Sequence, residues 1–192
     1  YFNTNLEEIK SIKKYYKVSF SSIVNSLFSN IIMNTLDLDY LNIAMTMMIR
    51  SGIITKRLTQ YNHYSALVYR SNKNNLDDLI KNTFKNLKNN RYIIPIVYLG
   101  FNIPKLSYRK QSSDKYKEID LVIGGGPSNS LTHNGYKSIN HKLYKHSHSA
   151  KIYIFHTSIH DKIYFSISSK IPLPNIEKIF YKNILKLTEK IS

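Results

Sequence analysis

The stretch from Tyr116 to Ser130 places the strongest constraint on how this chain folds. It holds a short apolar run rich in β-branched residues, Ile119 to Ile123, followed at once by Gly124-Gly125-Gly126-Pro127. The run predicts a buried strand that ends in a tight turn at the glycines. Glycines let a ligand or another backbone approach closely, and Pro127 sets the chain direction after them. Because no lysine or helix follows, this is a weak phosphate-loop signal, and a plain loop between two strands is the simpler interpretation.

The length and composition predict a globular protein. The chain has 192 residues, of which 42% are hydrophobic, so we expect a single domain over 1–192. The absence of cysteine excludes disulfides, thiolate metal sites and cysteine nucleophiles. No apolar run approaches the roughly 20 residues that span a bilayer. The chain begins with Tyr1 and has no signal-peptide pattern, so we expect it to be a piece of a longer protein.

The chain is strongly basic. It carries 28 Lys and Arg against 12 Asp and Glu, a formal charge of +16. Such a charge attracts nucleic acid, an acidic membrane or a phosphate-bearing cofactor. The lysines are spread through every segment, and Asn, Ile and Tyr are also abundant, as in proteins encoded by AT-rich DNA, so we interpret the charge mainly as a surface bias. Tyrosines interleaved with lysines suit base stacking, but no defined nucleic-acid motif is present, and nucleic acid is the less favoured partner.

Apolar periodicity predicts the order of helices and strands. We expect helices at 6–16, 23–32, 76–88 and 175–190, and strands at 41–49, 65–69, 119–123, 136–143, 151–157 and 162–168. Ser21 and Ser22 are expected to cap the second helix, and 158–161 to connect the last two strands. The segment 91–101 fits either a short helix or a short strand, and 104–117 an exposed loop. The most economical fold is a two-layer α/β (α+β) sandwich.

Few residue patterns in the sequence are specific for catalysis or metal binding. His141, His146 and His148, with Asp161 or Glu118, show none of the familiar zinc spacings, so no metal site is predicted. No Gly-x-Ser-x-Gly elbow marks a catalytic serine. The methionines at 45, 47 and 48 fit a lipid pocket or ordinary core filling, and core filling is favoured.

Four segments share an order and spacing with a known family. Val18 to Leu27 is similar to Val-Thr-x-Asn-Asp-Val-x-Leu, and Met45-Thr-Met-Met-Ile-Arg50 is similar to Val-Pro-Val-Ser-Leu-Arg. Asn62 to Tyr69 is similar to Asn-x-x-x-x-Leu-Val-x, and Gly126-Pro127 matches the end of Ser-Asn-Val-Pro-Gly-Pro. On these segments nearly the whole chain resembles the C-terminal half of the wax ester synthase/diacylglycerol acyltransferase family, within the CoA-dependent acyltransferase superfamily. The chain departs from the family pattern at Ser21, Ser22, Thr46, Ile123 and Lys170.

The resemblance implies a fold and a function. It implies half of a CoA-dependent acyltransferase-like protein, with a mixed sheet and helices on one face. Acyl-CoA would be the co-substrate, with no bound cofactor, and the acceptor a long-chain alcohol or diacylglycerol. The family's catalytic His-His-x-x-x-Asp-Gly lies in the other half, and no two histidines are adjacent here, so we assign no catalytic residue to this chain. The residues expected to line the substrate channel or to form its motifs are Gly124, Gly125, Gly126, Pro127, Ser21, Ser22, Arg50 and Asn62.

The resemblance also implies partners and a location. The partners would be the N-terminal catalytic half of the same protein and, peripherally, a membrane of the endoplasmic reticulum or plasma membrane. Two other hypotheses stay open. One is a non-catalytic basic module that binds lipid or nucleic acid. The other is an acyltransferase relative that has lost its motifs, such as the Asn replaced by Ile123, and is kept for protein interaction.

Overall fold

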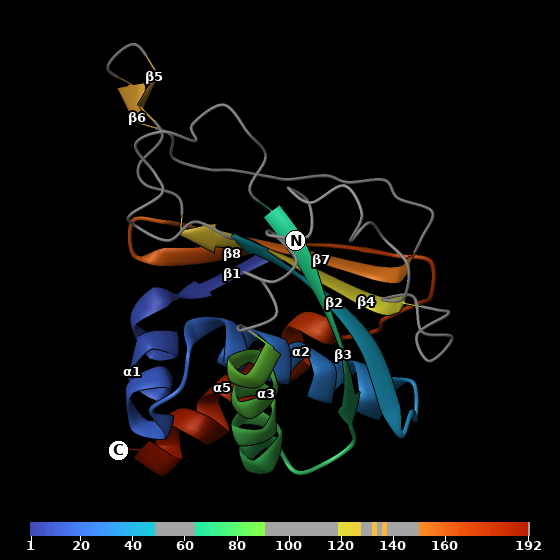
Figure 1. Cartoon of the computed structure of the whole chain (residues 1–192). Coiled ribbons are helices and arrows are strands. Elements are labelled where there is room, and N and C mark those ends of the chain that lie inside the picture. The colour runs from blue at the N-terminus through green and yellow to red at the C-terminus, as the bar shows by residue number, and fades with distance from the viewer. Residues whose placement is uncertain (49–63, 91–118, 128–131, 134–135, 138–149, 192) are drawn as a thin grey trace.

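A computed structural model describes residues 1–48, 64–90, 119–127, 132–133, 136–137 and 150–191. Its main sheet has six strands in the order β1-β8-β7-β4-β2-β3 (Figure 1). The three central strands β7, β4 and β2 run parallel, and their neighbours run antiparallel to them. The strands of this sheet are β1 (Phe2–Asn5), β2 (Tyr40–Met48), β3 (Tyr64–Asn72), β4 (Ile119–Pro127), β7 (Ala150–Ile159) and β8 (Lys162–Ser169).

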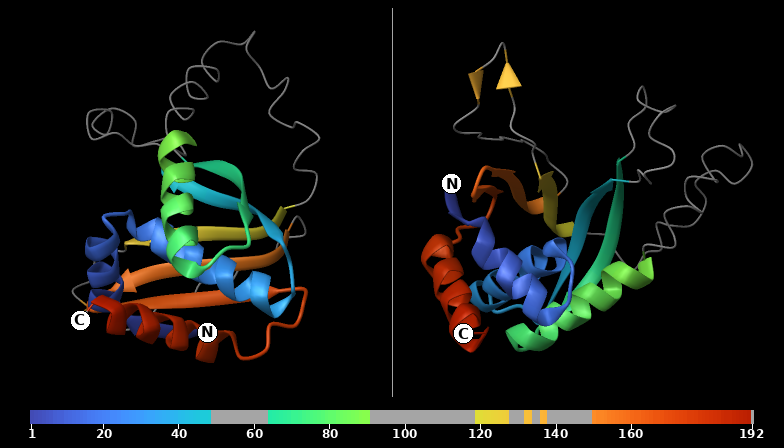
Figure 2. Two further views of the ribbon diagram at one scale, coloured as in Figure 1. Left: turned by 90° about the horizontal axis from the view of Figure 1, so that it is seen from below. Right: turned by 90° about the vertical axis from the view of Figure 1, so that its left-hand side faces the viewer.

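The described helices cover one face of this sheet, as the two further views show (Figure 2). They are α1 (Leu6–Tyr16), α2 (Phe20–Thr35), α3 (Leu76–Asn90) and α5 (Ile176–Ile191). A mixed sheet with helices on one face is the predicted fold class, which is therefore confirmed. Within the described ranges, no helix is both long and apolar enough to cross a bilayer.

Helix α2 lies at the centre of the helical layer. Every residue from Ser22 to Ser29 is buried, and α1, α3 and α5 all pack against this helix. A helix buried on all sides needs apolar or small residues around its whole circumference. Here Ile23, Leu27 and Phe28 fill the core, while serines permit close approach, and Ser26 donates a hydrogen bond to the Leu79 carbonyl of α3 at 3.2 Å. The predicted buried helix is confirmed.

Three local predictions need correction. The N-cap of α2 is Ser19, whose hydroxyl accepts from the Ser22 backbone N–H at 3.2 Å, so Ser21 and Ser22 lie inside the first turn and do not cap the helix. The connection between β7 and β8 is the two-residue turn His160–Asp161, because Ser158 and Ile159 still pair with β8. Strand β1 was not predicted, since four residues carry too short a pattern and the strand is defined only by pairing with β8.

Other predictions are confirmed or lie outside the described residues. Met45 is buried against α2, in agreement with core filling. Asn5 caps α1, because its side-chain Oδ1 accepts a hydrogen bond from the Glu7 backbone N–H at 2.8 Å. Of the strand predicted at 136–143, the structure describes Tyr136–Lys137 as β6, paired with β5 (Thr132–His133). The predictions for 91–101 and 104–117, and the three histidines considered for zinc, lie outside the described residues.

Candidate functional site

The parallel strands β2, β4 and β7 end at one edge of the sheet, which we call the carboxyl edge. Their last residues are Met48, Pro127 and Ile159, and β3 begins at the same edge because Tyr64 pairs with Met48. In open α/β sheets, ligands bind outside the carboxyl ends of the parallel strands. The carboxyl edge is therefore the first place to look for a site.

The glycine run lies in strand β4 and does not form the turn that was predicted. Gly124 to Pro127 pair in parallel with Phe155 to Ser158 of β7. Gly125 has φ +143°, and a Cβ placed on it would lie 2.0 Å from the His156 carbonyl oxygen. No side chain fits there, so this glycine is required for the two strands to approach. The sequence suggested that the glycines allow either a ligand or another backbone to approach. At Gly125 the group that approaches is the backbone of β7.

His156 lies beside Gly125 at the end of β7. Its side chain is only 8% exposed, and its ring centroid lies 5.9 Å from that of Phe20 and 6.3 Å from that of Phe165. Burial among these rings disfavours the charged imidazolium and lowers the pKa of His156 to about 4. His156 is therefore neutral at neutral pH. It is also a poor proton acceptor, since an effective general base has a pKa near the working pH.

The start of α2 reaches the same edge through Phe20, the first residue of that helix. Ser19 and Ser22 share a hydroxyl–hydroxyl hydrogen bond of 2.6 Å in this turn, and Ser22 is fully buried. Phe20 contacts His156, and His156 is adjacent to Gly125. The first turn of α2 and the glycine run of β4 thus both lie against His156, through Phe20 and Gly125.

Two predicted residues, Arg50 and Asn62, lie outside the described residues. The strands next to them in sequence are described, since Arg50 follows β2 and Asn62 precedes β3. Those strand ends meet at the carboxyl edge, as the Met48–Tyr64 pair shows. The roles expected for Arg50 and Asn62 remain predictions.

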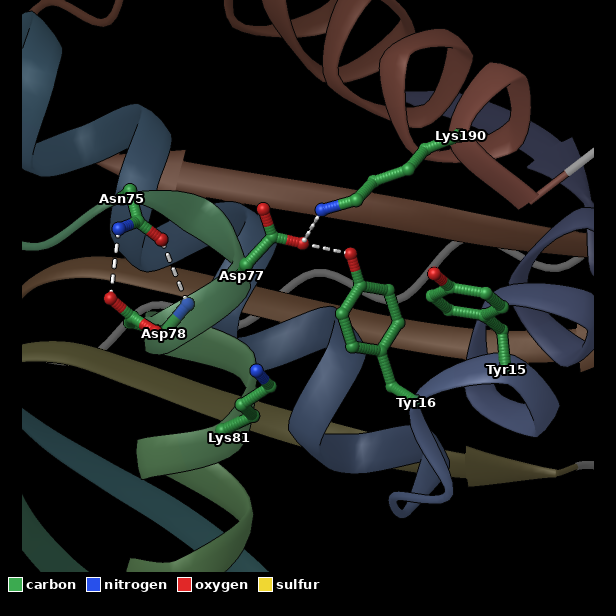
Figure 3. Close-up of a pocket in the computed structure, with 7 residues that line it drawn as sticks. All are labelled: Tyr15, Tyr16, Asn75, Asp77, Asp78, Lys81 and Lys190. Atoms are coloured by element: carbon green, nitrogen blue, oxygen red, sulfur yellow. Dashed lines mark hydrogen bonds and ion pairs between the residues drawn. The ribbon is translucent and has the colours of Figure 1, made fainter.

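A polar pocket lies between helices α1, α3 and α5 (Figure 3). Its volume is about 520 Å³. At its centre the Tyr16 hydroxyl of α1 and the Lys190 ammonium of α5 both donate to Asp77 Oδ1 of α3, the lysine at 2.8 Å. We call these three residues the helix clamp. The pocket is lined by Tyr15, Tyr16, Asn75, Asp77, Asp78, Lys81 and Lys190.

The helix clamp holds each of its groups in one protonation state. Hydrogen bonds from Lys190 and Tyr16 lower the pKa of Asp77, so its carboxylate stays charged. Burial, with the adjacent carboxylate, raises the pKa of Tyr16, so its hydroxyl keeps the proton. Because the Tyr16 hydroxyl stays protonated and the Asp77 carboxylate stays charged, their hydrogen bond joins α1 to α3 and transfers no proton. The helix clamp could not be predicted from the sequence, because its three members come from distant segments.

No group of three or more His, Asp or Glu side chains capable of holding a metal occurs among the residues with described placement. His160 lies on the turn after β7 with φ +55°, exposed, while His156 is buried in the sheet. The pair His156 and His160 therefore does not reproduce the spacing or the exposure of a catalytic histidine motif.

Comparison with known proteins identifies the fold. No protein-family model and no curated protein matches the sequence. Among solved structures, 99% of the chain matches the epimerization domain from the third module of tyrocidine synthetase B, with 12% identity, a TM-score of 0.67 and 47% of that chain covered. A wax ester synthase/diacylglycerol acyltransferase from Marinobacter aquaeolei VT8 matches over 99% of this chain and 48% of its own, with 13% identity and a TM-score of 0.60.

A third structure, the PapA2 acyl transferase, matches over 98% of this chain and 44% of its own, with 9% identity and a TM-score of 0.61. At such identities the likeness shows the fold alone. The chain has the fold of condensation-domain and acyltransferase proteins, and it spans about half the length of these structures. The fold that the resemblance implied is confirmed.

Proposed function

We propose that this chain is the C-terminal half of an O-acyltransferase that moves an acyl group from acyl-CoA to a long-chain alcohol or diacylglycerol. The observation that carries the proposal is the extent of the match: 99% of the chain superposes on 48% of a wax ester synthase/diacylglycerol acyltransferase. The order of the motifs around residues 18–27, 45–50, 62–69 and 126–127 supports the same family. The proposed location is the surface of the endoplasmic reticulum or plasma membrane.

In the proposed reaction, a base on the other half of the protein takes the proton from the acceptor hydroxyl. The oxygen attacks the thioester carbonyl, the carbon–sulfur bond breaks, and CoA leaves as the thiol after receiving that proton. The present chain would supply one wall of the channel. That wall would be the carboxyl edge, where the ends of β2, β4 and β7 lie side by side. His156 is not the base, because its pKa is lowered to about 4.

The experiment is an ester-forming assay on the intact native protein, with radiolabelled palmitoyl-CoA as donor and hexadecanol or diolein as acceptor. We expect a labelled wax ester or triacylglycerol from the intact protein and no turnover from residues 1–192 alone. Arg50→Ala and Asn62→Ala should each lower kcat/KM at least about tenfold, as expected for lost positioning contacts. Lys85→Ala, an exposed α3 lysine, is the matched control. Absence of ester, or equal activity in all three variants, contradicts the proposal.

The second candidate function is a non-catalytic basic module that binds anionic lipid or nucleic acid. It is favoured by the formal charge of +16 and by the lack of a suitable proton acceptor at the described carboxyl edge. Retention on heparin or on anionic vesicles that disappears in moderate salt, with no thermal shift on adding palmitoyl-CoA, would support this function over acyl transfer.

A further inference from the structure

Helix α5 carries two large hydrophobic side chains that are exposed. Among the described residues the exposed large hydrophobic side chains are Tyr1, Tyr15, Tyr40, Tyr181 and Leu185, and two of these five lie on α5. Leu185 is 57% exposed and Tyr181 39% exposed. Tyr15 of the adjacent helix α1 lines the same pocket as Lys190 of α5. Exposed apolar groups collected in one place mark an interaction surface.

The same helix carries an ordered row of lysines. Helix α5 buries Phe180, Ile184 and Leu187 against the core, so its opposite side faces outward. On that side Lys178, Lys182 and Lys186 follow one another at four-residue intervals, all exposed, with Leu185 among them. Helix α1 packs against α5 and adds exposed lysines at its own surface, Lys10, Lys13 and Lys14. We call this surface, formed by α1 and α5, the α1–α5 corner (Figure 2).

This mixture of groups fits the boundary of a lipid bilayer. Tyrosine places an apolar ring and a polar hydroxyl at the level of the headgroups, and leucine enters the acyl region. Lysine stems lie along the apolar boundary while their ammonium groups reach anionic phosphates. Nucleic acid offers basic groups the same attraction but no partner for Leu185. The exposed leucine on the lysine row is the observation that favours a membrane.

We propose that the α1–α5 corner is the surface through which this protein docks on membranes that contain anionic phospholipids. Docking here leaves the carboxyl edge unobstructed, since α1 and α5 lie on the helical face and near the β1 side of the sheet (Figure 1). The proposal concerns binding alone. It can hold or fail independently of acyl transfer, because its test contains no acyl-CoA and no acceptor.

The test is flotation of the purified chain with vesicles of phosphatidylcholine alone or with about one third phosphatidylserine, at physiological salt. We expect strong partition only onto the anionic vesicles. The triple variant Lys178→Gln/Lys182→Gln/Lys186→Gln should lower that partition on the order of 100-fold, since each lysine near anionic lipid contributes roughly fivefold. Leu185→Ser should lower it roughly tenfold, by removing apolar insertion.

The matched control is Lys81→Gln/Lys85→Gln/Lys88→Gln, which removes the same charge from exposed positions of α3. We expect this control to lose less than about threefold, because these lysines lie outside the proposed surface. Circular dichroism and the melting temperature verify that each variant is folded. Equal losses from both triple variants, or an unchanged partition of Leu185→Ser, would overturn the proposal. Binding of a duplex DNA probe that requires the α5 lysines, without vesicle binding, would assign the corner to nucleic acid instead.

Discussion

The carboxyl edge and the helix clamp join distant parts of the chain by opposite physical means. At the carboxyl edge, Gly125 and His156 meet through backbone contact and burial, in apolar surroundings. In the helix clamp, Tyr16, Asp77 and Lys190 meet through charge and hydrogen bonds near solvent. We therefore expect the stability of the carboxyl edge to depend on added side-chain volume and on protonation of the buried His156 ring. The stability of the helix clamp should instead depend on its polar groups and on the salt concentration.

The largest effect is expected from a methyl group at the carboxyl edge. In Gly125→Ala the new Cβ would meet the His156 carbonyl oxygen at 2.0 Å, at a backbone φ of +143°. Backbone strain and overpacking together should lower the free energy of unfolding by roughly 3 kcal/mol or more. Urea unfolding measures the change, with Lys85→Ala on the surface of α3 as control. A decrease in the free energy of unfolding below about 1 kcal/mol would show that β4 shifts away from β7 at little energetic cost.

The next effect is a pH dependence from His156. Its pKa is about 4 in the folded protein, below the ordinary 6.5, so protonation favours the unfolded chain. The contribution of this ring to stability is complete above pH 6.5 and decreases as the pH falls toward 4, by up to about 3 kcal/mol.

Urea unfolding at each pH should therefore show a smaller decline over this range in His156→Gln than in the wild type. The control His160→Asn removes the exposed histidine of the turn and keeps a residue that tolerates its positive φ. An identical decline in His156→Gln and the wild type would mean that the buried ring is not the titrating group.

A smaller effect is expected from the helix clamp. Tyr16→Phe removes the hydroxyl that donates to Asp77, and the half-exposed position limits the loss to about 1 kcal/mol. Because the pKa of Asp77 is lowered, its contribution is present at neutral pH and is lost as the pH falls below the ordinary value of 3.8. A double-mutant cycle of Tyr16→Phe with Asp77→Asn should show coupling between the two positions. Additive losses would mean that the two residues do not stabilise the fold together.

The smallest effect is expected from Lys190, whose side chain is about half exposed. Solvent and salt screen its attraction to Asp77, so Lys190→Met should shift the melting temperature only slightly at low salt. The shift should disappear in about 0.5 M NaCl, where screening is nearly complete over such distances. A shift that persists at high salt would indicate that packing of the lysine stem, and not charge, holds α5 in place.

Local pattern predicted most of the described elements. Strand β8 alternates the buried Ile163 and Phe165 with less buried residues, and α5 repeats its apolar residues at helical spacing, so the buried face of each can be predicted from its sequence. The errors occur where pairing partners decide the structure. Strand β1 exists because β8 lies beside it, and the glycines of β4 remain extended because β7 pairs with them. No pattern within either segment contains that information.

The candidate site was predicted in part. The glycines and the serines of α2 were singled out one by one, and the structure shows that Gly125 and Phe20 both lie against His156. The neutrality of His156 was not predicted, because it follows from the rings around it. The helix clamp was not predicted, since its three members are contributed by residues 16, 77 and 190, and no periodicity relates positions so far apart.

By itself the sequence determined most of the helices and strands and the buried side of the amphipathic ones, because those properties depend on the period of apolar residues along a short stretch. It also determined the charge and the absence of thiol chemistry. Only the tertiary structure decided that Gly125 excludes a side chain, that His156 stays neutral, and that lysines and exposed tyrosines share one corner. Steric exclusion, desolvation and surface composition are properties of neighbours in space, and neighbours in space are set by the fold.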